Sequence, residues 1–147
     1  DDQPVKASRG TVLMPDTNLD VALARSYDLI ALPGGLPGAD HLNEDPRIHQ
    51  LLKRQVDEDR YIAAICAAPK VLASAGLLNG RRATSFPGAL EGIPVADLDY
   101  QEGAVVQDGR ILTSRGPGTA MDFALALIEL LAGRETRDKV EGPLQRP

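Results

Sequence analysis

Short apolar runs alternate along the chain with segments of helical periodicity. The runs are five or six residues long, the first three are mainly apolar, and three of the four are followed directly by proline. Continuous apolar runs of this length are typical of strands that are buried on both faces of a parallel sheet. The pattern predicts strands over residues 10–14, 27–32, 61–65 and 82–86.

Three other segments have the composition or spacing of helices. Apolar residues three and four positions apart predict an amphipathic helix over 46–56, which begins at an Asp-Pro pair. Helix-forming composition predicts a second helix over 67–72. The third runs over 119–132, where Thr119 and Asp122 have the spacing of a capping box. Its nearly uniform apolar sequence predicts a largely buried helix.

The C-terminal half adds a predicted hairpin. The pair Asp108-Gly109 lies between apolar residues at 105–106 and 111–113, and Asp-Gly is a strong signal for a tight turn between antiparallel strands. The tail after Gly133 is rich in proline and charge, and we expect it to wrap over the body or to fray. The repeated strand-helix order predicts an α/β sandwich around a mostly parallel sheet, as a single domain over 1–147.

Composition narrows the classes of function. The 147 residues include 16 Lys and Arg and 21 Asp and Glu, a net charge of −5, which argues against a nucleic-acid or anionic-membrane partner. No apolar run is long enough to span a bilayer. One cysteine, Cys66, excludes an internal disulfide, and with two histidines it leaves little material for a metal site. A lone thiol and no signal peptide predict a cytoplasmic protein. The chain begins without methionine, which indicates a fragment or one piece of a cut polypeptide.

The ends of the predicted strands carry the candidate chemistry, because ligands of α/β sheets gather at the carboxyl ends of the strands. Cys66 lies between a strand and a helix, among alanines. This is the setting of a nucleophile elbow, in which small neighbours allow a sharp turn to expose the side chain. A helix N-terminus there favours thiolate over thiol. The alternative is a small buried hydrophobe.

Two other strand ends could complete a site. Gly34-Gly35 is either an ordinary tight turn or a place where a backbone N–H joins that of Ala67 in holding an oxyanion. The loop 116–119 resembles a phosphate-binding loop but lacks the residues of a nucleotide-binding motif. Arg115, directly before this loop, could bind an anion or lie at an interface. His41 could approach the site, whereas we expect His49 to face solvent.

Together these motifs resemble the DJ-1/PfpI superfamily, in its branch of DJ-1, ThiJ and YajL-like proteins. The resemblance is carried by Tyr27-Asp-Leu-Ile-Ala-Leu-Pro-Gly-Gly35 with Gly38-Ala39, by Ala63-Ala-Ile-Cys-Ala-Ala-Pro69, and by Ile111-Leu-Thr-Ser-Arg-Gly-Pro-Gly-Thr119 with Phe123-Ala124. It implies a flavodoxin-like three-layer sandwich and a homodimer without a cofactor or a metal.

The resemblance also implies roles for individual residues. Cys66 would be the reactive, oxidisable nucleophile, with the backbone N–H groups of Gly35 and Ala67 as its anion pocket. Arg9 and Arg115 would lie near the dimer interface and the active site.

The chain departs from the family pattern in three places. Phe86 occupies a position where many members carry histidine, which weighs against a Cys-His relay and agrees with the YajL-like branch. Ala67 replaces the histidine that follows the cysteine of the peptidases, so we expect no peptidase activity. Members begin with a β-α unit that carries a glutamate, whose protonated carboxyl is hydrogen-bonded to the cysteine sulfur. This chain has no residue that matches the glutamate. A separate chain or a further segment would have to supply that unit.

The resulting hypothesis is a cofactor-free enzyme that uses Cys66 on reactive dicarbonyls or glycation adducts, in the manner of a glyoxalase III or a deglycase. The alternative is an oxidation sensor or redox-regulated chaperone that uses the same cysteine. An inert domain that only keeps the fold is a third possibility.

Overall fold

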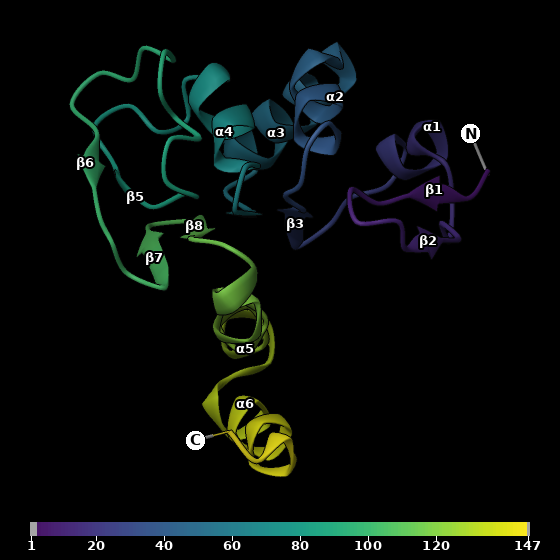
Figure 1. Ribbon diagram of the computed structural model, residues 1–147, viewed down its shortest axis with the longest axis vertical. Helices are drawn as coiled ribbons and strands as arrows, with labels where there is room; N and C mark the ends of the chain where they lie inside the picture. Colours follow the sequence, from purple (N-terminus) through teal and green to yellow (C-terminus); the bar gives the residue numbers. More distant parts are fainter. Residues whose placement is uncertain (1–2, 147) are drawn as a thin grey trace.

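A four-stranded sheet lies between two groups of helices (Figure 1). The computed structural model describes residues 3–146. The strands stand in the order β3-β4-β8-β7, with the first three parallel and β7 antiparallel to β8. Their bounds are Leu29–Leu32 for β3, Tyr61–Ile65 for β4, Ile111–Ser114 for β8 and Val105–Asp108 for β7.

Helices cover both faces of this sheet (Figure 1). On one face lie α2 (Gly38–Glu44), α3 (Pro46–Asp57) and α4 (Pro69–Ser74), and on the other lies α5 (Ala120–Ala132). The α/β fold of flavodoxin type, with its mostly parallel sheet, is therefore confirmed. The amphipathic helix predicted over 46–56 is α3, which Asp45 caps by accepting the backbone N–H of Arg47 at 2.9 Å. Hydrogen bonds from Arg47 also lower the pKa of the Asp45 carboxyl.

The core divides at the sheet, because successive side chains of a strand point to opposite faces. Along β4, Ile62 and Ala64 join the larger core cluster, which packs under α3 and α4. Between them, Ala63 joins the smaller cluster with Leu112 and Phe123, on the side of α5. Strand β4 is thus buried on both faces, as its continuous apolar sequence predicts.

The predicted hairpin is present. Strands β7 and β8 pair antiparallel from Val105 opposite Ser114 to Asp108 opposite Ile111. Gly109 closes the turn with φ of 59°, a conformation that glycine adopts without the steric cost that a side chain brings.

The strand predicted over 10–14 is shorter than expected and lies outside the central sheet. Only β2 (Val12–Leu13) forms there, and it pairs antiparallel with β1 (Val5–Lys6). The hairpin and the short helix α1 (Leu19–Leu23) lie beyond the β3 edge of the sheet (Figure 1). Its apolar side chains remain exposed, namely Val5, Val12, Leu13 and Met14. Apolar side chains favour burial, but the described part of the chain does not cover these four.

Three further sequence predictions need correction. The strand predicted over 82–86 is only two residues long, β5 (Arg82–Ala83), and pairs with β6 (Asp99–Tyr100). The strand ends there because the backbone N–H of Thr84 donates to the Thr113 hydroxyl and not to the backbone of a neighbouring strand. The helix over 67–72 begins two residues later, at Pro69.

Helix α5 is the third case. Only Phe123 and Leu125 of this helix are buried. One side of the helix packs on the sheet, and α6 (Arg134–Glu141) covers only part of the remaining surface. The tail after Gly133 therefore forms a helix. Thr119 does not cap α5, because its hydroxyl bonds within the preceding 3-10 turn, η1 (Pro117–Thr119). A second such turn, η2 (Gly142–Leu144), follows α6.

Among residues 3–146, no helix combines the length and the apolar character that a membrane crossing requires.

Candidate active site

Cys66 lies in a sharp turn between β4 and α4. Its φ of 64° is in the left-handed region, which a residue with a side chain seldom adopts. Two backbone hydrogen bonds hold the turn: the Cys66 N–H donates to the Ser114 carbonyl at 2.9 Å, and the Phe86 N–H donates to the Cys66 carbonyl at 2.8 Å. The thiol-bearing residue is half-buried. This is the backbone geometry of the predicted nucleophile elbow.

Cys66 lies between the strand and the helix, as the sequence predicts, but the helix begins further along the chain. Helix α4 starts at Pro69 with Ala68 as its N-cap, whereas the prediction starts it at residue 67, directly after Cys66. The elbow itself, held by the neighbouring strand ends, therefore fixes the direction of the side chain.

Gly34 lets the loop after β3 approach this elbow. A Cβ at position 34 would lie 2.6 Å from the Cys66 Cβ and 2.7 Å from the Ile65 carbonyl oxygen, distances that real Cβ atoms do not show. Only glycine permits this contact. The close approach also places position 34 beside Ala67, whose backbone N would be 3.2 Å from the same Cβ.

The two backbone donors that the sequence singled out are left without internal partners. In the described part of the chain, neither the N–H of Gly35 nor that of Ala67 donates to a protein acceptor. Ala67 is buried, and buried backbone N–H groups are nearly always hydrogen-bonded. Two unpaired donors beside a thiol suit an anionic oxygen or a sulfinate.

Two polar features at the site escaped the sequence interpretation. Ser8, at the tip of the β1-β2 hairpin, lies over Gly35: a Cβ there would be 2.8 Å from the Ser8 Oγ. Lys70 of α4 forms an ion pair with Asp40 of α2, which links the helix after Cys66 to the helix after the glycine loop. The sequence pattern predicts neither contact, because the two residues of each pair lie about 30 positions apart in the chain and meet only in the folded structure.

The other predicted residues lie around the elbow or away from it. Arg9 is exposed beside Ser8 on the hairpin, and Arg115 follows β8, where its Nη1 donates to the Glu102 carbonyl at 3.1 Å. His41 is exposed on α2. His49, expected to face solvent, is half-buried with its Nε2 2.7 Å from the Asn43 carbonyl oxygen. Within residues 3–146, no hydrogen bond joins either histidine or either arginine to the Cys66 sulfur.

The loop 116–119 uses its own polar groups internally. The Thr119 Oγ1 accepts the Gly116 N–H at 3.0 Å and lies 2.7 Å from the Ser114 Oγ. These bonds stabilise the strand end beside Cys66 and leave the loop poorly suited to cradle a phosphate. Between residues 3 and 146, no group of three or more His, Cys, Asp or Glu side chains is placed to hold a metal ion.

Comparison with known proteins gives consistent matches. The model of the DJ-1/PfpI family matches residues 1–130. The Parkinson disease protein 7 homolog of Danio rerio is 42% identical over 144 residues, which are 97% of this chain and 76% of that protein. The glutathione-independent glyoxalase DJR-1.2 of Caenorhabditis elegans is 38% identical over 142 residues, 97% of this chain and 75% of that protein. The crystal structure of Drosophila melanogaster DJ-1beta superposes with a TM-score of 0.92 at 40% identity, covering 99% of this chain and 78% of that one.

Proposed function

This chain belongs to the DJ-1/PfpI family, and on that premise we propose that it is a cofactor-free, cysteine-dependent enzyme acting on reactive dicarbonyls or early glycation adducts. The observation that carries the proposal is the half-buried thiol of Cys66 beside the unpaired N–H groups of Gly35 and Ala67. The name of the C. elegans relative, a glutathione-independent glyoxalase, supports the same chemistry.

The first step is addition of the Cys66 thiolate to the aldehyde carbon of a compound such as methylglyoxal. A carbon–sulfur bond forms, and the π electrons of the carbonyl move to its oxygen, whose charge the two backbone donors stabilise. Protonation of that oxygen gives a hemithioacetal. On an early glycation adduct, a carbinolamine, the same thiolate attacks the carbon bonded to nitrogen. The carbon–nitrogen bond breaks, the amine leaves with a proton, and the same hemithioacetal remains on Cys66.

The next steps move protons. Loss of the proton on the hemithioacetal carbon and protonation of the neighbouring carbonyl carbon, through an enediol, give a 2-hydroxyacyl thioester. Water cleaves this thioester, releases lactate and restores the thiol. Methylglyoxal and one water thus become lactic acid, with no external oxidant or reductant.

A proton carrier is required for this sequence. In residues 3–146, no hydrogen bond joins the Cys66 sulfur to a carboxyl or an imidazole group. We therefore propose that a glutamate of a β-α unit, carried by a separate chain or a further segment, performs this task. We also propose that the Ser8 hydroxyl, which lies over Gly35, contacts the substrate.

Lactate formation without glutathione tests the proposal. The protein, together with the chain or segment that supplies the glutamate, is mixed with methylglyoxal and the products are followed by proton NMR. We expect catalytic turnover, and we expect iodoacetamide to abolish it in proportion to alkylation, since the chain has one cysteine. Lactate formation that survives complete alkylation would refute the role of the thiol.

A second function uses the same geometry. An oxidation sensor or redox-regulated chaperone would convert Cys66 to a sulfinate, whose oxygens could accept the N–H groups of Gly35 and Ala67. Mass spectrometry after mild peroxide treatment distinguishes the two functions when it is compared with the turnover rate. The sensor predicts the gain of two oxygens at Cys66 with negligible turnover, and failure to gain them counts against it.

We also propose that the protein is a homodimer and acts in the cytoplasm, where a free thiol remains reduced. The exposed apolar side chains of the β1-β2 hairpin, Val5, Val12, Leu13 and Met14, offer a surface to a second copy or to the added β-α unit. An intact-mass spectrum of the purified protein identifies a second polypeptide if one is present.

The Lys70–Asp40 pair is expected to position the site. Replacing Lys70 with Met should lower kcat for methylglyoxal about threefold to tenfold, because small displacements of reacting groups are costly. Stability should fall by less than about 1 kcal/mol, since the pair is partly solvated, with side-chain exposures of 23% and 39%. Lys70→Arg should restore kcat.

The matched control for this variant is Lys53→Met. It breaks the exposed Lys53–Asp57 pair on α3, at 3.0 Å, which touches neither the glycine loop nor the elbow. Equal loss of kcat in the two methionine variants would contradict the positioning role.

A further inference from the structure

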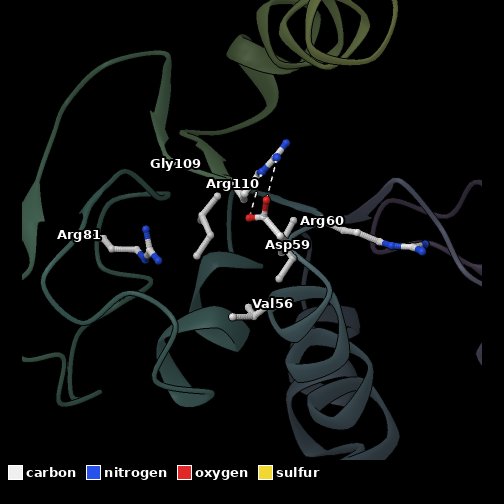
Figure 2. Close-up of a pocket in the computed structure, with 8 residues that line it drawn as sticks. Val56, Asp59, Arg60, Arg81, Gly109 and Arg110 are labelled. Atoms are coloured by element: carbon white, nitrogen blue, oxygen red, sulfur yellow. Dashed lines mark hydrogen bonds and ion pairs between the residues drawn. The ribbon is translucent and has the colours of Figure 1, made fainter.

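A pocket lies at the end of the sheet opposite Cys66. Its volume is about 230 Å³, below the roughly 300–1,000 Å³ of pockets for drug-sized ligands. It is bounded by the turn after α3, by the start of β4 and by the β7-β8 turn (Figure 2). The lining residues are Val56, Asp59, Arg60, Ile62, Arg81, Gly109, Arg110 and Ile111.

The three arginines of this pocket differ in how fully they are engaged. Arg110 makes a two-pronged contact with Asp59, at 3.3 and 2.9 Å, and its guanidinium lies 4.5 Å from the centre of the Tyr61 ring. The hydrogen bond to Asp59 raises the pKa of the Arg110 guanidinium. Arg60 pairs with Glu58 at 3.1 Å and extends away from the pocket (Figure 2). Neither guanidinium is available as the main partner of a ligand.

Arg81 is engaged far less. Its Nη1 reaches the carbonyl and the carboxylate of Asp108, both at 3.5 Å, the outer limit of a hydrogen bond. The Asp108 carboxylate has its closer bond elsewhere, from the Arg82 backbone N–H at 2.9 Å. The Arg81 side chain extends from one wall towards the residues of the opposite wall (Figure 2). Its remaining N–H donors make no hydrogen bond within residues 3–146.

The surroundings select the kind of anion. Val56, Ile62 and Ile111 supply apolar walls, which favour a ligand with a short hydrocarbon part. The carboxylates of Asp59 and Asp108 lie near the arginines and offset part of their positive charge. A dianion loses far more hydration free energy than a monoanion on entering the pocket, so a site whose positive charge is partly offset favours a monoanion. An arginine fork with one available edge matches a carboxylate. We propose that this pocket binds short-chain monocarboxylates, with the carboxylate on Arg81 and the alkyl part against Val56, Ile62 and Ile111.

Butyrate is a suitable probe, followed by amide NMR shifts of the full chain. We expect saturable shifts at Gly109 and Arg110 at millimolar butyrate, and at least tenfold weaker binding of the neutral isostere butyramide. Arg81→Gln should weaken butyrate binding at least tenfold. Arg82→Gln, one residue further on and exposed, is the matched control and should change it less than twofold.

Several results would overturn the proposal. These are the absence of saturable shifts, equal binding by wild type and Arg81→Gln, or sulfate binding as tightly as butyrate. Thermal melting of Arg81→Gln shows that the variant is folded, which we expect because the residue is partly exposed and its contacts with Asp108 are long. The inference is independent of the chemistry proposed at Cys66.

Discussion

Replacing Cys66 with alanine or serine is expected to lower lactate formation from methylglyoxal by at least about a thousandfold, the scale seen when a catalytic nucleophile is removed. Alanine leaves no group to form the bond to the aldehyde carbon. Serine keeps an oxygen in nearly the same place, but a hydroxyl without an adjacent base is a far weaker nucleophile at neutral pH than a thiol. The two variants should therefore be equally inactive.

The measurement must follow lactate and not only the loss of methylglyoxal. The chain has 16 Lys and Arg side chains, which react with dicarbonyls without catalysis and consume the substrate in every variant. Thermal melting controls for folding, and both variants should melt close to wild type because Cys66 is only half-buried. Lactate formation by Cys66→Ala at the wild-type rate would disprove the proposed function.

The second large effect is expected from Gly34→Ala. The new methyl group would lie 2.6 Å from the Cys66 Cβ and 2.7 Å from the Ile65 carbonyl oxygen, so the loop and the elbow must move apart. Overpacking of this kind costs about 1–3 kcal/mol of unfolding free energy. Since the N–H groups of Gly35 and Ala67 lie on the two segments that separate, kcat/KM should fall about a hundredfold.

Gly38→Ala is the matched control for this substitution. A Cβ at Gly38 meets nothing within 4 Å, and the residue begins α2, so alanine should leave activity unchanged and stability equal or slightly higher. Denaturant unfolding and steady-state kinetics of both variants provide the test. If Gly34→Ala matched Gly38→Ala in both measurements, the close approach at the elbow would not matter.

Features encoded by neighbouring residues could be predicted from the sequence. The continuous apolar run of β4 followed by Cys66 among alanines indicates both the buried strand and the elbow. The glycine pair after β3 and the Asp-Gly turn between β7 and β8 are similar cases, because small residues or a special backbone conformation identify them directly.

Contacts between distant segments could not be predicted in this way. The apolar character of α5 indicates that the helix favours burial, but it does not say how much of the helix other elements cover, and most of α5 remains partly exposed. Ser8 reaches Gly35 only because of where the β1-β2 hairpin packs. The same holds for Lys70 and Asp40, which no local pattern pairs.

The left-handed backbone of Cys66 places activity and stability in opposition. For a residue with a side chain, that conformation costs roughly 1–2 kcal/mol, which is appreciable against the about 5–15 kcal/mol by which folded proteins are stable. A sequence chosen for stability alone would place glycine at this position and would have no thiol. Any effort to make this protein more robust should therefore strengthen parts of the chain away from residue 66 and leave its unfavourable conformation intact.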